Sequence, residues 1–168
     1  MMSSLVIRPA TAANDRQLRG AVIVLQEYER LRHPTRLPGE QIADRYLRWM
    51  RQRAEAAGVV LVAENEGKFV GFVSGWIEES ANIAETPESN RFGYISDLCV
   101  LPAFRGQRIA RQLLAAIERY LCRAGVMRLR ITALAANPSA QAAYEHTGFA
   151  PYEIVYEKVA DDPNCTPP

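Results

Sequence analysis

Two hydrophobic periods follow one another along the chain, first a helical one and then one typical of strands. The short apolar run Leu5–Ile7 predicts a first strand. Apolar residues at near-helical spacing then predict a helix after Thr11 and a second helix from about residue 40 to 57, where Gly58 ends it. Residues 32–39 lie between the two helices and contain prolines and a glycine, which break a helix.

The arginines of the second predicted helix allow two interpretations. Arg45, Arg48, Arg51 and Arg53 form either a basic binding surface or an ordinary solvated helix face. Charged residues that recur along a helix are usually solvated, so we expect a solvated face here.

After residue 58 the hydrophobic period changes to two. Residues 59–64 and 69–77 predict two strands, and the glycine-containing turn Asn65–Lys68 predicts that they form a hairpin. A polar, acidic loop over residues 78–91 follows. It leads into the apolar run Ile95–Leu101, which predicts a buried central strand.

The rest of the chain predicts a β-α-β unit and two further elements. A helix over 106–124 is followed by a strand over 127–134, and such a crossover makes parallel neighbours of this strand and the central one. A short helix over 137–146 and a last strand over 149–159 complete the series. The fold class is therefore α/β with one mixed sheet, in the order β-α-α-β-β-β-α-β-α-β.

Composition places the chain among soluble globular proteins. It has 168 residues, 48% hydrophobic and 23% charged, so we expect a single domain over 1–160 and a flexible tail over 161–168. The net charge of +1 argues against nucleic acid and anionic membranes as partners. No segment is apolar enough to span a bilayer, and the N-terminal residues lack the regions of a signal peptide, so we expect neither.

The cysteines and histidines indicate neither a disulfide nor a metal site. Cys99 lies in the central strand and Cys122 in the following helix, so both are expected to be small core residues, while Cys165 falls in the tail. His33 and His146 form no metal-ligand pattern, and no metal is expected. This use of cysteine indicates a reducing compartment, and we expect a cytoplasmic protein.

The stretch Tyr94–Leu114 carries the most specific chemistry. The central strand ends at Pro102 and passes through the basic glycine turn Arg105–Gly106 into a helix. Amides in the first turn of a helix have no partner inside it and lie at the positive end of its dipole, which favours phosphate binding. Arg108 and Arg111 add positive charge. The alternative is a basic helix start with a solvated surface.

Two blocks of sequence resemble the GCN5-related N-acetyltransferase (GNAT) family, which moves an acetyl group from acetyl-CoA to an amine. The first is Asp97-Leu-Cys-Val-Leu-Pro-Ala-Phe-Arg-Gly-Gln-Arg-Ile-Ala, where Arg105 and Ala110 take the first and last positions of the pyrophosphate signature Arg/Gln-x-x-Gly-x-Gly/Ala. The second is Asn137-Pro-Ser-Ala-Gln-Ala-Ala-Tyr-Glu-His-Thr-Gly-Phe. Arg108 replaces the middle glycine of the signature. A positive φ there would cost energy, whereas the cation would suit phosphate.

The resemblance implies a GNAT fold whose central strand is splayed from its parallel neighbour, with the pantetheine arm of the cofactor in the gap. It implies backbone contacts from Leu98, Cys99 and Val100, and an oxyanion stabilised by the amide of Val100. Asn137 would reach the pantetheine, cap the helix that begins at Pro138, or do both. The implied cofactor-binding residues are Leu98, Cys99, Val100, Arg105, Gly106, Gln107, Arg108, Ile109, Ala110, Arg111, Asn137 and Tyr144.

The resemblance also implies the chemistry, which is direct attack of an amine on acetyl-CoA in a ternary complex. Tyr144 would be the general acid that protonates the departing thiolate, rather than only a packed aromatic residue. Diamine-type members carry Glu-Asp where this chain has Ser96-Asp97, so Asp97 is either the general base or a structural or substrate-orienting group. Cys99 is not expected to carry the acyl group, because no histidine is near it in sequence.

Other functions and the identity of the acceptor stay open at this point. Arg108 and the missing carboxylate at Ser96 also suit a CoA-binding sensor that has lost turnover, and a structural protein with a degenerate pocket is a third alternative. We expect the acceptor to bind near residues 28–40, the loop 78–91 and Tyr152. The glutamates of that loop suit a cationic amine, although solvated surface is the commoner role. Polyamine-like amines, aminoglycosides, amino acids and protein N-termini all stay open, and so does a homodimer.

Overall fold

A five-stranded mixed sheet forms the centre of the protein, whose computed structural model describes residues 5–159. Along the sheet the strands follow chain order, and the first four pair antiparallel while the last pair is parallel. They are β1 (Leu5–Pro9), β2 (Gly58–Asn65), β3 (Lys68–Glu79), β4 (Arg91–Val100) and β5 (Leu129–Ile131). The predicted mixed α/β sheet is thus confirmed, whereas the predicted tail and Cys165 lie outside the described residues.

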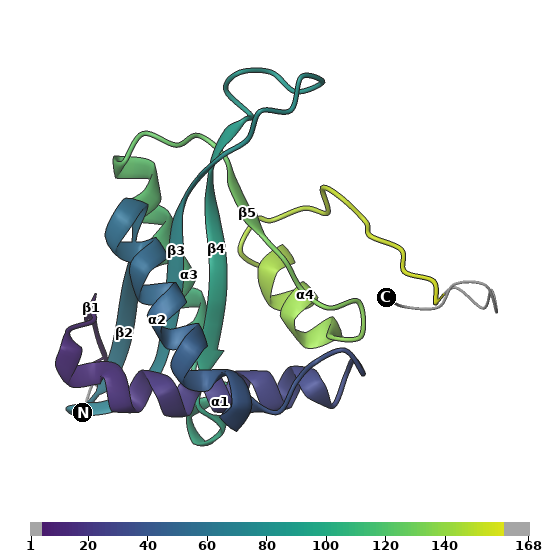
Figure 1. Ribbon diagram of the computed structural model, residues 1–168. Helices are drawn as coiled ribbons and strands as arrows, with labels where there is room; N and C mark the ends of the chain where they lie inside the picture. Colours follow the sequence, from purple (N-terminus) through teal and green to yellow (C-terminus); the bar gives the residue numbers. More distant parts are fainter. Residues whose placement is uncertain (1–4, 160–168) are drawn as a thin grey trace.

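Helices cover both faces of this sheet (Figure 1). On one face lie α1 (Asp15–Arg30) and α2 (Gly39–Ala57), and on the other lies α3 (Ile109–Arg123). The short helix α4 (Pro138–Glu145) stands beyond β5. Each face has its own core, one built around Met50, Phe72 and Trp76, the other around Ile95, Leu113 and Ile117.

A β-bulge in β4 shapes the site. Ser74 of β3 pairs with Asp97, but its neighbour Gly75 pairs with Ile95, so Ser96 is an extra residue on β4. Because side chains alternate along a strand, this insertion brings Tyr94 and Asp97 to the same face of the sheet. That face is the one covered by α1 and α2.

The parallel pairing of β4 with β5 stops at the same place. It runs from Gly93–Leu129 to Ile95–Ile131 and does not continue past the bulge in either strand. Beyond the bulge, β4 and the segment that continues β5 separate, as Figure 1 shows. The sheet is therefore open between the second half of β4 and the segment that leads to α4.

Two predicted elements differ from the structure. The last strand, predicted over 149–159, is wrong, because these residues have no regular secondary structure and most of their side chains are exposed. Pro151 near its start has no N–H to donate to a strand ladder. The strand predicted over 127–134 is shortened to Leu129–Ile131 by the separation from β4.

The third long helix and one of its cysteines also need correction. The helix begins at Ile109 rather than at 106, because the residue before it has a left-handed backbone conformation. Cys122 is exposed, so its predicted place in the core is wrong. It follows the buried Leu121 directly, and one residue along a helix turns the side chain by about 100° away from the buried stripe. Within residues 5–159, none of the helices has the length and hydrophobicity needed to cross a membrane.

Candidate active site

The turn that leads into α3 presents unpaired backbone donors. Among the described residues, the amides of 106–111 donate to no backbone or side-chain acceptor. Gly106 has a φ of 78°, and a Cβ built there would meet nothing within 4 Å. Amides at the start of a helix with open space in front of them suit the oxygens of a pyrophosphate, so these residues fit the CoA group that the sequence implies.

Arg108 stands in this turn with a φ of 62° and a ψ of 14°. This is the left-handed region, which glycine adopts without cost and which most other residues avoid. Because Arg108 replaces a signature glycine, a positive φ was one possibility at this position, and the structure confirms it. Its side chain is exposed beside the free amides.

The exposed side chain of Arg105 makes two contacts with the protein. Its Nε donates to the carbonyl oxygen of Val100 at 3.1 Å, and its guanidinium carbon lies 5.1 Å from the centre of the Tyr28 ring. Arg105 thus holds the end of β4 against the C-terminal part of α1. The contact with Val100 is one that the sequence did not indicate.

The open edge of β4 offers further donors. The amide of Leu101 donates to Val70 of β3 at 2.9 Å. In an antiparallel pair, successive residues turn their backbone groups to opposite edges, so the amides of Val100 and Leu98 point away from β3 and toward the gap. By the same alternation the amide of Cys99 points to β3. Of the three residues implied for backbone contacts, two therefore face the gap.

Asn137 closes the gap at its far end. Its side-chain oxygen accepts a hydrogen bond of 3.2 Å from the amide of Ala140, so it is the N-cap of α4. The predicted capping role is confirmed. The same oxygen lies 3.5 Å from the hydroxyl of Tyr28, which connects α1 with α4 across the opening.

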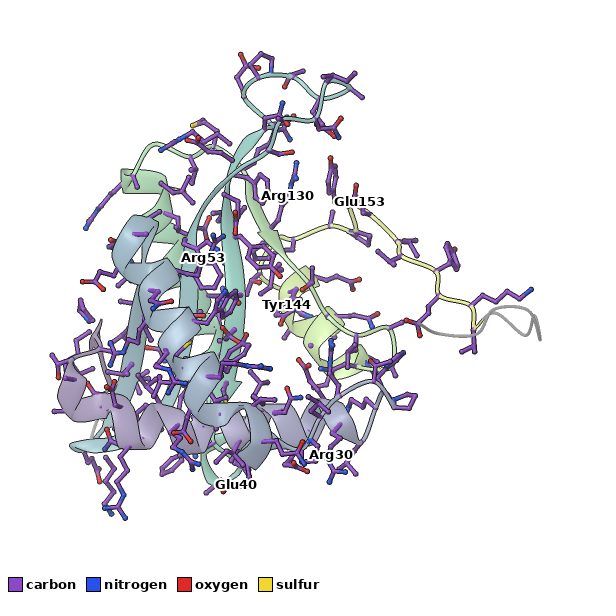
Figure 2. The ribbon with its side chains drawn as sticks, in the orientation of Figure 1. Arg30, Glu40, Arg53, Arg130, Tyr144 and Glu153 are labelled. Atoms are coloured by element: carbon purple, nitrogen blue, oxygen red, sulfur yellow. The ribbon has the colours of Figure 1, made fainter. Side chains whose placement is uncertain are left out.

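Tyr144 projects from α4 on the side that faces β4 (Figure 2). Its ring packs beside Phe149, with ring centres 6.2 Å apart. Burial, with smaller effects from the charges of Glu29 and Asp97, raises the pKa of the phenol to about 12. Within the described part of the chain its hydroxyl makes no hydrogen bond. A phenol that stays protonated and has no partner is free to donate into the gap.

Asp97, on β4, lies on the other side of the opening from Tyr144, and 5% of its surface is exposed. The hydroxyl of Tyr46 donates to one carboxyl oxygen at 2.7 Å, and that of Ser74 donates to the other at 2.5 Å. Burial raises the pKa of Asp97, while the hydrogen bonds from these two hydroxyls and from Ser96 oppose that shift. A carboxyl with a raised pKa is a stronger base, and it titrates nearer to neutral pH.

Two cavities meet at this place. We call the first, of about 750 Å³, the α2-side cavity, and the second, of about 1290 Å³, the β5-side cavity. Asp97 lines the first and Tyr144 the second, and both are lined by Glu78, Tyr94 and Thr132. The α2-side cavity is lined by Val22, Leu25, Gln26, Glu29, Thr35, Arg36, Leu37, Ile42, Arg45, Tyr46, Trp49, Trp76, Glu78, Tyr94, Ser96, Asp97 and Thr132.

Several residues of this cavity were not expected from the sequence. Tyr46 and Glu29 come from α2 and α1, more than forty residues before β4, and no local motif marks either of them. Glu78 was assigned to the acidic loop, but it lies on β3, where it accepts from Trp76 Nε1 at 2.7 Å and pairs with Arg53. The general expectations that residues 28–40 and the loop 78–91 bind the acceptor did point toward this region, and they include Glu29 and Glu78.

Neither a metal site nor a cysteine nucleophile is found in the described residues. No group of three or more histidine, cysteine or acidic side chains in residues 5–159 could hold a metal ion. Burial raises the pKa of Cys99 to about 12, and its thiol contacts the carbonyl of Ala21 under α1. It therefore stays a protonated core residue.

Comparison with known sequences identifies similar proteins. Residues 24–149 match the acetyltransferase (GNAT) family. A curated relative, the uncharacterized N-acetyltransferase YycN of Bacillus subtilis (strain 168), is 31% identical over 94 residues, which make up 56% of this chain and 56% of that protein. The match thus spans about half the length of this curated relative.

Solved structures share the fold at low sequence identity. The aminoglycoside N-acetyltransferase AAC(6')-Iy in complex with CoA has a TM-score of 0.72 and 20% identity, and the match covers 96% of this chain and 98% of that one. A mutant of the BH1408 protein from Bacillus halodurans has a TM-score of 0.79 and 21% identity, covering 92% of this chain and 99% of that one. These likenesses show the fold.

Proposed function

Because the chain belongs to the acetyltransferase (GNAT) family, we propose that it transfers the acetyl group of acetyl-CoA to a primary amine by direct attack in a ternary complex. One observation carries this proposal. The open edge of β4 continues into the free amides of 106–111, and Tyr144 and Asp97 face the opening from its two sides. The AAC(6')-Iy structures, one with CoA and one with a bisubstrate analogue, support a CoA-type co-substrate.

The turn and the open strand edge hold the co-substrate in this proposal. The amides of 106–111 donate hydrogen bonds to the pyrophosphate oxygens, with Arg108 and Arg111 supplying charge at the rim. The amides of Leu98 and Val100 pair with the extended pantetheine as a neighbouring strand would. The amide of Val100 then stabilises the oxygen of the thioester carbonyl as it becomes negative.

Tyr46 and Asp97 take up the proton of the acceptor. The attacking amine loses a proton to the oxygen of Tyr46 while Tyr46 passes its own proton to the carboxylate of Asp97, to which it is already hydrogen-bonded. The amine forms the new bond to the acetyl carbon as the carbon–sulfur bond breaks. Tyr144 gives its proton to the leaving thiolate. Tyr46 is then already neutral, and exchange with solvent returns a proton to Tyr144 and removes one from Asp97.

The experiment is an acetylation assay with acetyl-CoA and a panel of amines, followed by release of free thiol and by mass spectrometry of the product. We expect thiol release that depends on the amine, and a product heavier by one acetyl group. Thiol release without an acetylated amine, or no release with any amine, contradicts the proposal.

A second function is favoured by the burial of Asp97 under two hydroxyl donors, which suits a structural role for the carboxyl. In that case the protein binds acyl-CoA and responds to it without turnover. Calorimetry of CoA binding and the acetylation assay on the same preparation separate the two functions. CoA binding without any acetylated amine indicates the second function, and CoA binding with an acetylated amine indicates the first.

A further inference from the structure

Four aromatic rings form one continuous wall of the α2-side cavity. Tyr46 and Trp49 of α2, Trp76 of β3 and Tyr94 of β4 follow one another with ring centres 5.1, 5.2 and 6.1 Å apart. All four line the cavity, and Trp49 remains 41% exposed. A row of rings with one partly exposed member suits a flat apolar group that stacks on it.

The carboxylates of this cavity already have partners. Glu29 accepts from Arg36 Nε at 3.0 Å, and Glu78 accepts from Trp76 and pairs with Arg53. Asp97 is buried under hydroxyl donors. A ligand with several positive charges needs carboxylates that are free to face it. In this lining Glu29 and Glu78 each already pair with an arginine, and Asp97 is buried, so the cavity is less suited to a polycation such as a polyamine or an aminoglycoside.

One cation of the cavity has no partner. Arg45 lines the cavity on α2, four residues before Trp49, and therefore on the same side of that helix. Among the described residues, its side chain forms no hydrogen bond, ion pair or cation–ring interaction. The other arginine of the lining, Arg36, is neutralised by Glu29. Arginine binds carboxylates with two parallel hydrogen bonds, so a free arginine beside an aromatic wall favours an aromatic carboxylate as ligand.

We propose that the acceptor is a primary amine that carries an aromatic ring and a carboxylate, of which the aromatic amino acids are the simplest. This inference rests on the proposed acetyl transfer. The ring stacks on the wall at Trp49, the carboxylate pairs with Arg45, and the amine points to Tyr94 and Thr132, where the two cavities meet. This substrate class differs from the aminoglycoside named for the AAC(6')-Iy structure.

Matched substrates test the proposal. L-Tryptophan and L-phenylalanine are compared with tryptamine and phenethylamine, which keep the ring and amine but lack the carboxylate, and with spermidine and an aminoglycoside. We expect kcat/KM to be roughly tenfold higher for each amino acid than for its decarboxylated partner, since a hydrogen-bonded charge pair contributes about that factor. Equal or faster acetylation of the decarboxylated amines or of the polycations overturns the proposal.

Two arginine variants assign the effect. Arg45→Gln should raise KM for L-tryptophan about tenfold and leave KM for tryptamine unchanged. Arg48→Gln is the matched control, because Arg48 is an exposed arginine on the same helix that does not line the cavity. An equal effect of both variants, or no effect of Arg45→Gln, contradicts the role of Arg45.

A binding measurement keeps this inference separate from the proposed function. If no amine of the panel is acetylated, acetyl transfer fails, and calorimetry of L-tryptophan with the CoA-saturated protein still decides the ligand class. Tighter binding of L-tryptophan than of tryptamine, lost in Arg45→Gln, supports an aromatic carboxylate. Equal binding of the two, or binding unaffected by the variant, overturns it.

Discussion

The hydroxyl of Tyr46 on α2 donates a 2.7 Å hydrogen bond to the buried carboxyl of Asp97 on β4. Burial raises the pKa of both groups, and the charge of Asp97 raises that of Tyr46 further. Tyr46 therefore remains the proton donor of the pair, and Asp97 is the member that titrates. The pair connects the wall of the α2-side cavity to a proton acceptor behind it.

The first prediction concerns the pH dependence of catalysis. Asp97 must be ionised to take a proton, so kcat should be low at pH values below the raised pKa of Asp97 and should rise as pH increases through that pKa. Asp97→Asn should lower kcat by roughly 10²-fold or more and remove this acidic limb. The measurement is kcat against pH for both proteins.

Asp44→Asn is the control, because Asp44 is exposed on α2, does not line the cavity and pairs with Arg19 of α1. It should keep the wild-type profile. An Asp97→Asn protein that retains full activity with an unchanged acidic limb shows that Asp97 is not the base.

The second prediction concerns Ser74, whose hydroxyl donates to Asp97 within the core. This bond holds the pKa of Asp97 down against the effect of burial, so Ser74→Ala should move the acidic limb of kcat to higher pH. It should also lower the free energy of unfolding by about 1–3 kcal/mol at pH 7, because the buried carboxylate loses a donor.

The stability effect of Ser74→Ala should depend on pH with a defined sign. The pKa of Asp97 is raised on folding. The stability that this group contributes is therefore fully present at pH values below its pKa in the unfolded protein, and it is lost as pH rises through its pKa in the folded protein. The variant raises the folded pKa further, and its penalty should be larger at pH 7 than at pH 4. Chemical denaturation at the two pH values measures this. Ser80→Ala, at an exposed serine, should leave the free energy of unfolding unchanged at both pH values. If the penalty of Ser74→Ala is the same at pH 4 and pH 7, Ser74 does not control the pKa of Asp97.

The third prediction concerns Tyr144. Tyr144→Phe should lower kcat by roughly 10²-fold, because the departing thiolate loses its proton donor. The phenol makes no hydrogen bond in the described structure, so the melting temperature should stay the same, and so should the affinity for CoA. Steady-state kinetics and calorimetry of CoA binding provide the two readouts.

Because the pKa of Tyr144 is raised to about 12, no loss of activity from its ionisation is expected below about pH 10. Tyr156→Phe is the matched control, since Tyr156 is 88% exposed in the segment after α4. If Tyr144→Phe turns over as fast as this control, another group is the acid.

Local patterns predicted the parts of the site that are local in sequence. The strand–turn–helix from Tyr94 to Leu114 could be recognised because its turn residues and its helical apolar spacing are contiguous. The hairpin turn is also local in sequence, and the structure confirms it. Both Glu66 and Gly67 have the positive φ that a tight turn requires. Asn137 as a helix cap also followed from its immediate neighbours.

The remainder of the site depends on contacts between distant segments. The bulge at Ser96 is a one-residue shift in pairing with β3, and the sequence of β4 alone does not reveal it. The contact between Tyr46 and Asp97 joins residues 51 positions apart. The wrong strand at 149–159 has a strand-like composition, but a strand forms only where a neighbouring edge pairs with it.

The last prediction separates the two effects of Arg108. Its left-handed backbone costs about 1–2 kcal/mol for any residue with a Cβ, whereas its cation lies beside the free amides of 106–111. Arg108→Ala removes the charge and keeps the Cβ, and Arg108→Gly removes both. The glycine variant should therefore be more stable than the alanine variant by about 1 kcal/mol, measured by chemical denaturation.

If the cation helps to bind pyrophosphate, both variants should weaken CoA binding about equally, by up to roughly fivefold, and more at low than at high salt. Arg123→Ala at the far end of α3 should leave CoA binding unchanged. Weakening in the alanine variant alone means that the backbone conformation, and not the charge, limits binding. In that case glycine at this position restores what the family signature provides, and the arginine makes no contact with phosphate.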